Sequence, residues 1–318
     1  TTNMYNHKNS NKKYLELLKF MTNGEGASGR SELVPLFIKN ANGSIVYDED
    51  GNKYIDYMLA YGPLILGHTH PSIVNAIINQ VQKGTIFGFS HDLEIEVSKK
   101  IVDLFPTIDQ VRFNSTGTEA VQSAIRVARS YTSKNKIVKF VGQYHGWLDN
   151  ILISGAATKF EDMGCYNSPN AIRISKGQPE SVLNDIMVAH WNDSNRINDL
   201  VKKHKSDIAA IITEPMMTNA HIIPPKNGFL QDLKTIAIDN DILLIFDEVV
   251  TGFRLGLKGG QGYYDVTPDI SIFGKALGGG LPISCFGASN EIMSVMNKSG
   301  AIQLGTFNTN PLCLASSN

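Results

Sequence analysis

A lysine and an aspartate each follow a short apolar run, and their side chains could do chemistry together. Asp247 ends the run 242–246, and Lys275 lies just past the run 270–273. Both runs have the length of a β-strand, and polar side chains just past such strands lie at the carboxyl edge of a sheet, where open α/β folds bind ligands. A lysine that can form a Schiff base and a carboxylate that can keep a pyridine nitrogen protonated are the two groups that pyridoxal 5′-phosphate requires of its protein.

A phosphate site would complete this chemistry, and the turn after residues 111–113 has a suitable composition. It reads Ser115, Thr116, Gly117 and Thr118, and apolar residues then recur with helical spacing at positions 120, 121, 124, 125 and 128. A helix N-terminus offers free amides and a positive dipole to a phosphate, and each charge-assisted hydrogen bond contributes about 1.5–3 kcal/mol. The alternative is an ordinary Ser/Thr N-cap. Asp247 and Lys275 downstream favour the phosphate site.

Further motifs occur in the order of one known family. The matching segments are 43–57 (GSIVYDEDGNKYIDY), 62–71 (GPLILGHTHP), 116–120 (TGTEA), 144–146 (YHG), 214–215 (EP), 247–254 (DEVVTGFR), 274–282 (GKALGGGLP), 305–306 and 310–311. On these motifs, which extend over almost the whole chain, the sequence resembles the class III (fold type I) pyridoxal-phosphate aminotransferases, and within them the glutamate-1-semialdehyde aminomutase-like branch. The resemblance implies an α/β fold with a mostly parallel sheet flanked by helices, a small N-terminal α+β segment, and the usual C-terminal domain missing.

The resemblance also implies roles for the residues nearest the cofactor ring. Lys275 would hold the cofactor as a Schiff base and then act as general base and acid, which requires a lowered lysine pKa. Asp247 would keep the ring nitrogen protonated. Tyr144 would stack on the ring, and Val249 would pack beneath it.

Other matching positions imply contacts at the edges of the cofactor. Glu214 and Asn219 fit positions near its O3′ atom, with hydrogen bonding inside their own loop as the alternative. His145 either touches the cofactor or holds its turn. Thr306 matches a threonine that reaches the cofactor phosphate of the other subunit, which implies a homodimer whose sites are shared across the interface.

Departures from the family pattern concern the substrate side. Tyr61 stands where aminomutases usually have tryptophan, and Arg30 is a candidate for binding a substrate carboxylate, with a solvated loop arginine as the alternative. We therefore expect an aminotransferase that moves an amino group from an amino acid or amine donor to a carbonyl acceptor. The alternatives are glutamate-1-semialdehyde 2,1-aminomutase and a non-catalytic relative. A nucleotide-binding protein is disfavoured because the glycine run 278–280 lacks the Walker spacing.

Composition and charge narrow the choice of partner. The 318 residues are 42% hydrophobic, enough for a full α/β core, and the net charge of -1 argues against a nucleic acid or a membrane surface. Three widely separated cysteines favour free thiols and a cytoplasmic location over disulfides. We expect no metal, because His68 and His70 lack a third ligand nearby.

The apolar pattern also predicts the order of elements. Apolar residues at 14, 15, 17, 18 and 21 indicate an amphipathic helix, and residues 45–57 indicate a β-hairpin with its turn at Asp50-Gly51. Further strands are expected at 111–113, 136–141, 208–213, 242–246, 270–273 and 284–288. We divide the chain into an N-terminal segment, 1–70, and a large cofactor-binding domain, 71–318.

Overall fold

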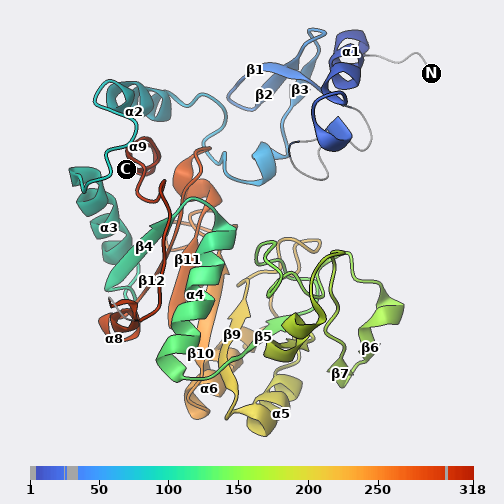
Figure 1. Ribbon diagram of the computed structural model, residues 1–318, viewed down its shortest axis with the longest axis vertical. Helices are drawn as coiled ribbons and strands as arrows, with labels where there is room; N and C mark the ends of the chain where they lie inside the picture. Colours follow the sequence, from blue (N-terminus) through green and yellow to red (C-terminus); the bar gives the residue numbers. More distant parts are fainter. Residues whose placement is uncertain (1–4, 25, 27–34, 298–299) are drawn as a thin grey trace.

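The structure is a computed structural model that describes residues 5–24, 26, 35–297 and 300–318. A central β-sheet with helices packed against it forms most of the molecule, and a smaller antiparallel unit from the start of the chain stands beside one end of the sheet (Figure 1). The large sheet is the element that positions the candidate site.

Within the described residues, the large sheet has seven strands. Their order is β4 (Gln110–Asn114), β12 (Ser284–Ala288), β11 (Ile270–Phe273), β10 (Leu243–Glu248), β9 (Ile208–Thr213), β5 (Lys136–Phe140) and β8 (Ile186–Ala189). From β11 to β8 every neighbouring pair is parallel, whereas β12 is antiparallel to β11 and β4. All the strands expected from the apolar runs are present. β8 was not predicted: its run of four residues is as short as that of β11, and unlike β11 it is not followed by a motif.

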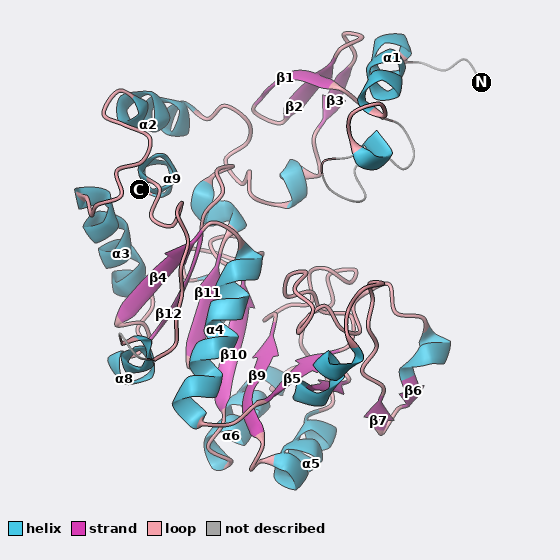
Figure 2. Ribbon diagram, viewed as in Figure 1, coloured by secondary structure: helices cyan, strands magenta, loops and turns pink. Residues whose placement is uncertain are grey.

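Side chains alternate between the two faces of the sheet and build a separate core on each. Ile137 of β5 packs in the cluster beneath α4 (Gly117–Thr132), and its neighbour Val138 packs in the opposite cluster with α5 (Ser194–His204) and α6 (Phe229–Asp239). Figure 2 shows α4 lying along one face of the strands. Each fully buried aliphatic side chain contributes about 1.5–3 kcal/mol, so these two clusters fix the sheet between its helices.

Other helices pack around β4 and β12. α3 (Asp92–Leu104) contacts β4 and α9 (Pro311–Ser317), α9 contacts α2 (Pro71–Val81), and α8 (Asn290–Met293) contacts β12 and α4. In Figure 1, α9 lies beside α2, at the end of the chain. Short elements complete the fold: α7 (Gly259–Tyr264), β6 (Gly164–Cys165) and β7 (Ser168–Pro169). Across the residues that the structure describes, no helix is long and apolar enough to span a bilayer.

The N-terminal unit confirms the predicted hairpin and corrects the predicted helix. β2 (Ile45–Asp48) pairs antiparallel with β3 (Lys53–Ile55), and β1 (Ile38–Asn42) adds a further strand. The helix, α1 (Lys8–Leu17), begins earlier than its apolar pattern indicates and ends before two residues of that pattern, Leu18 and Met21. The carboxylate of Asp50 explains this start, because it accepts hydrogen bonds from the backbone amides of Asn9 and Ser10 at 2.8 and 2.9 Å. The division of the chain at residue 70 stays a prediction.

Candidate active site

A cavity of about 170 Å³ lies at the carboxyl edge of the sheet, where the ends of β5, β9, β10 and β11 meet the start of α4. Many of the side chains singled out in the sequence share this cavity. Its lining residues are Gly117, Thr118, Val121, Tyr144, His145, Gly146, Glu214, Asn219, Asp247, Val249, Val250 and Lys275.

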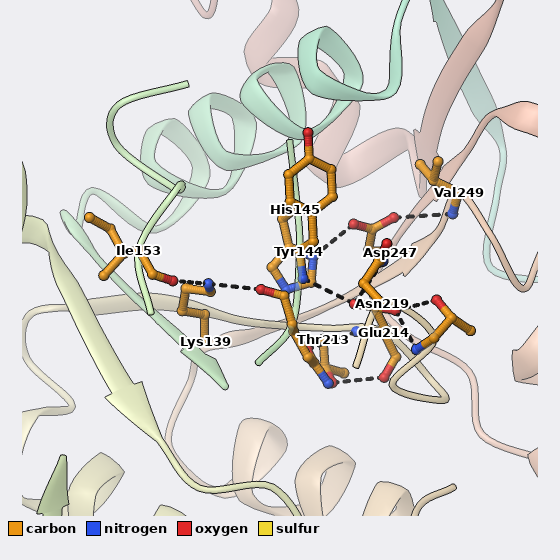
Figure 3. A network of polar contacts seen from close by, with 11 residues as sticks. Lys139, Tyr144, His145, Ile153, Thr213, Glu214, Asn219, Asp247 and Val249 are labelled. Atoms are coloured by element: carbon orange, nitrogen blue, oxygen red, sulfur yellow. Dashed lines mark hydrogen bonds and ion pairs between the residues drawn. The ribbon is translucent and has the colours of Figure 1, made fainter. Parts of the chain in front are cut away.

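Asp247 lies near the end of β10, with its carboxylate buried against the cavity. Its Oδ1 atom accepts a hydrogen bond from the backbone amide of Val249 at 3.1 Å, and its Oδ2 atom lies 2.7 Å from Nδ1 of His145 (Figure 3). Because an ionised carboxylate can only accept, the imidazole donates from Nδ1. His145 is itself buried and lines the cavity, so the two roles that the sequence left open for it are geometrically compatible.

Lys275 is the first residue of a short 3₁₀ turn, Lys275–Gly278, that follows β11. Burial lowers the pKa of Lys275, the carboxylates of Asp247 and Glu214 oppose this change, and the guanidinium of Arg254 adds to it. A lowered pKa leaves more of the amine uncharged and nucleophilic near neutral pH. The lysine also has a left-handed backbone, with φ of 44°, a conformation that side-chain-bearing residues keep at functional sites when the surroundings enforce it.

Glu214 follows β9 and holds the turn that carries Tyr144. Its Oε1 atom accepts from the backbone amide of Tyr144 at 3.1 Å and from Nδ2 of Asn219 at 3.3 Å. Its Oε2 atom accepts from the backbone amide of Thr218 at 2.7 Å and from the Thr218 hydroxyl. The loop hydrogen bonding that the sequence offered as an alternative for Glu214 and Asn219 is therefore present, and both side chains also line the cavity.

The start of α4 is a capping box. Thr116 is the N-cap, and its Oγ1 accepts from the backbone amide of Glu119 at 3.3 Å. The Glu119 carboxylate in turn accepts from the backbone amides of Ser115 and Thr116 at 3.1 and 2.8 Å. The N-cap alternative thus describes Thr116, and Gly117 and Thr118 are the turn residues that line the cavity. A phosphate-binding role for the turn stays a prediction.

The Val249 side chain packs closely against the backbone at Gly117 and Gly274, which explains why these two motif positions are glycine. A Cβ atom on Gly117 would lie 3.3 Å from both methyl carbons of Val249, and one on Gly274 would lie 3.4 Å from Cγ1 of the same side chain. Val249 therefore fills the space between the start of α4 and the end of β11, at the wall of the cavity.

Other predicted site residues lie outside the cavity lining. Tyr61 is 48% exposed, but the next residue, Gly62, is close enough to the site that a Cβ there would lie 3.6 Å from Cδ of Lys275. Thr306 is exposed and borders a surface depression with Phe87 and His91. Arg30 lies outside the described residues, so its predicted contact with substrate stays a prediction.

Supporting residues were missed in the sequence. Lys139 and Gln143 are buried, and Lys139 donates to the backbone carbonyl of Gln143, the residue before Tyr144. Arg254 belongs to the motif 247–254 but was given no role at the site, and it donates to the carbonyl of Gly62 at 2.5 Å, close to Lys275. A signal for Lys139 existed, because a lysine within an apolar strand of a parallel sheet has no solvent to face.

The chemistry of these side chains fits pyridoxal phosphate. Lys275 has an amine that can react with the cofactor aldehyde, and Asp247 has a carboxylate that can bind the ring nitrogen. Tyr144 has a half-exposed aromatic ring that can stack on the cofactor, and the N-terminus of α4 can bind the phosphate. In the part of the chain that the structure describes, no group of three or more His, Cys, Asp or Glu side chains is placed to hold a metal ion. His68 instead pairs with Asp56, 2.7 Å from its Nε2 atom.

Comparison with known proteins decides the family. The sequence model of the class III aminotransferases matches residues 27–318. The chain belongs to the class III aminotransferase family. A glutamate-1-semialdehyde 2,1-aminomutase of Ignicoccus hospitalis is 45% identical over 88% of this chain and 65% of its own length, and relatives with 42–44% identity have the same name. This class III chain therefore spans about 65% of the length of that relative.

Solved structures confirm the fold expected for a class III aminotransferase. An omega-transaminase from Sphaerobacter thermophilus has a TM-score of 0.92 and 32% identity, covering 97% of this chain and 71% of that one. A transaminase solved with pyridoxal phosphate bound has a TM-score of 0.90 and 29% identity, covering 98% of this chain and 73% of the other. The mostly parallel α/β sheet of fold type I is thus confirmed for this chain.

Proposed function

We propose that this chain binds pyridoxal phosphate and moves an amino group between an amino acid or amine and a carbonyl acceptor. The observation that carries the proposal is the shared cavity of Lys275 and Asp247, at the ends of the neighbouring parallel strands β11 and β10. The similar transaminase with pyridoxal phosphate bound supports the choice of cofactor.

Lys275 and Asp247 would have different roles in the reaction. When bound, the cofactor supplies an aldehyde that takes up an amino group and a ring that withdraws electrons from the neighbouring carbon. Lys275 would hold the cofactor covalently and then move a proton to or from the substrate carbon, which its lowered pKa favours. Asp247, oriented by His145 and by the amide of Val249, would hold the proton on the ring nitrogen.

The remaining cavity residues would orient the cofactor. Tyr144 would present its ring as a stacking surface, with Val249 opposite. Glu214 and Asn219 would lie at the edge of the ring. Burial, and to a lesser degree the charge of Asp247, raises the pKa of Tyr144, which keeps the phenol protonated. The turn of Ser115, Thr116, Gly117 and Thr118 would bind the phosphate through the first amides of α4, those of Gly117 and Thr118, since the amides of Ser115 and Thr116 already donate to Glu119.

A homodimer with shared sites forms part of the proposal. Thr306 is exposed and lies in sequence between Leu304, 84% exposed, and Phe307, 63% exposed, and these two apolar side chains support a surface that a partner covers. A second subunit seated there would receive Thr306 near its own cofactor phosphate. We also propose a cytoplasmic location, supported by Cys165, Cys285 and Cys313, none of which is in a disulfide.

A specific observation favours a second reaction for the same site. The relatives with 42–45% identity are named glutamate-1-semialdehyde 2,1-aminomutase, a reaction in which one substrate supplies both the amine and the carbonyl. The substitution of Tyr61 for the usual tryptophan favours an aminotransferase with a more open substrate side. Both reactions use the same cofactor residues and differ in the need for an external acceptor.

One experiment tests the function and separates the two reactions. The cofactor-loaded protein is mixed with an amino donor alone, and its absorption spectrum is followed. An aminotransferase converts its cofactor once and stops, and turnover resumes when a carbonyl acceptor is added. An aminomutase isomerises glutamate-1-semialdehyde continuously with no acceptor present. A protein that neither binds the cofactor nor changes its spectrum with donors contradicts the proposal as a whole.

A further inference from the structure

Lys139 is a buried cation that the proposed reaction does not use. The residue belongs to β5, between β8 and β9, and it is 1% exposed. Lysine is rarely buried without a partner, because removing an ammonium group from water costs several kcal/mol. Its Nζ atom donates to the backbone carbonyl oxygen of Gln143 at 3.1 Å and to that of Ile153 (Figure 3). No ion pair forms at this amine among the residues that the structure describes.

The first of these carbonyls belongs to the residue just before Tyr144. Gln143 is also fixed through its side chain, because its Nε2 donates to the Thr213 hydroxyl at 3.0 Å and its Oε1 accepts from the backbone amide of Glu214 at 3.1 Å. Lys139 thus fixes the main chain of Gln143, while β9 fixes its side chain. The direction in which the chain leaves Gln143 sets where the Tyr144 ring and the His145 imidazole stand.

The second carbonyl that Lys139 binds, that of Ile153, belongs to a different loop. Ile153 is fully buried, and its neighbour Ser154 accepts a hydrogen bond from the backbone amide of Gly142 at 2.8 Å. The Lys139 amine therefore joins the turn after β5 to the loop that packs against it. Lys139 does not itself line the cavity of Lys275 and Asp247, so it can affect the cofactor only through the residues that it holds.

We infer that Lys139 is a positioning residue: its buried amine holds the carbonyls of Gln143 and Ile153 and so sets the placement of Tyr144 and His145 beside the cofactor. This inference rests on the proposed function for the identity of the cofactor. Burial lowers the pKa of Lys139 to about 7, and the charge of Glu214 opposes the change. An uncharged amine still has N–H groups to donate, so the contact with both carbonyls persists when the charge is lost.

The test uses Lys139→Met, which keeps the length of the side chain and removes its donors. Lys136→Met is the matched control, because Lys136 lies on the same strand, is half-exposed and pairs with Asp207 at 3.4 Å on the surface. The readouts are the dissociation constant for pyridoxal phosphate and the visible circular dichroism of the bound cofactor. We expect the control to match the wild type and Lys139→Met to bind about tenfold more weakly, with a reduced dichroic band.

A second comparison separates positioning from a general loss of stability. In a Tyr144→Ala background the ring that Lys139 places is absent, so adding Lys139→Met should weaken cofactor binding by clearly less than tenfold, the remaining loss being the part that acts through His145. An equal loss in both backgrounds contradicts the inference, and so does wild-type affinity and dichroism in Lys139→Met. If the Met variant does not fold, Lys139→Arg is measured instead, since it keeps donors in a different geometry. Wild-type affinity and dichroism in that variant would contradict the requirement for an amine at this place.

Hydrogen exchange distinguishes failure of this inference from failure of the proposed function. In the cofactor-free protein, Lys139→Met should speed exchange at the amide of Tyr144 while the amides of β9 remain protected as in the wild type. Unchanged exchange at Tyr144 contradicts the role of Lys139. A wild-type protein that does not bind pyridoxal phosphate contradicts the proposed function instead, and leaves the exchange measurement valid.

Discussion

The imidazole of His145 and the carboxylate of Asp247 lie 2.7 Å apart, both buried, although their strands are separated by β9 in the sheet. The turn after β5 brings the histidine across the end of β9, where Glu214 holds the amide of Tyr144. The carboxylate that would meet a ring nitrogen is therefore oriented from a second strand. A site built in this way depends on the turn at residues 143–145 as much as on Asp247 itself.

Replacing Asp247 by Asn should slow amino transfer by about 10²–10⁴-fold, because a neutral amide cannot keep a ring nitrogen protonated. The cofactor should still bind, since Lys275 and the phosphate turn are unchanged. Steady-state kinetics and the visible spectrum of the purified variant measure the two effects. Asp241→Asn, an exposed position just before β10, serves as the control. Near-normal turnover in Asp247→Asn would show that this carboxylate is not needed.

Tyr144 allows the contribution of its ring to be separated from that of its hydroxyl. Tyr144→Phe keeps the stacking surface, so cofactor affinity should change little. Tyr144→Ala removes the surface, and the loss of about 0.5–1.5 kcal/mol of stacking should weaken binding by up to about tenfold. Equilibrium titration of the cofactor-free proteins gives both values. Equal affinities for the Ala and Phe variants would rule out stacking.

The low pKa of Lys139 predicts how stability varies with pH. Its pKa is about 7 in the folded protein, whereas an unfolded lysine has a pKa of about 10.4. Between these values the unfolded chain binds more protons, so this group makes the folded state more stable as pH rises through the window. The free energy of unfolding of the wild type, measured relative to Lys139→Met, should therefore increase between pH 7 and pH 9. A difference that stays flat or falls over this range is the opposite outcome.

Subunit mixing tests the role proposed for Thr306. Inactive Lys275→Ala subunits combined with Thr306→Ala subunits should regain activity, because each heterodimer would have one site with both native residues. The readout is the rate after refolding the two variants together, compared with each refolded alone. Mixtures no more active than their parents, or a fully active monomer by light scattering, would contradict a shared site.

Local patterns predicted the parts of the fold that depend on nearest neighbours in sequence. The strands at 208–213 and 270–273 could be predicted to the residue, because their apolar runs are bounded by polar ones. The start of α1 could not be predicted, because the Asp50 carboxylate that accepts from the first backbone amides of the helix is distant in sequence and is placed beside them by the hairpin. β8 was also missed, although its four apolar residues lie between Asp185 and His190 and it pairs with β5.

The site shows a similar limit. The sequence motifs predicted Asp247, Lys275 and Tyr144 as site residues, and their side chains line the cavity. Lys139 acts on main-chain carbonyls, which every residue has, so no motif identifies its partners. The turn before α4 shows the same limit. Its backbone amides can donate to the Glu119 carboxylate, as they do in the capping box, or to a bound phosphate, and the sequence is compatible with either acceptor.

The most direct test of this account is the identity of the lysine that binds the cofactor. The protein is incubated with pyridoxal phosphate, reduced with borohydride, digested, and its labelled peptide identified by mass spectrometry. We predict a label on Lys275, and its loss together with amino transfer in Lys275→Ala, because only an amine can form the bond. A label on a different lysine, including Lys139, or undiminished activity in Lys275→Ala, would contradict the account.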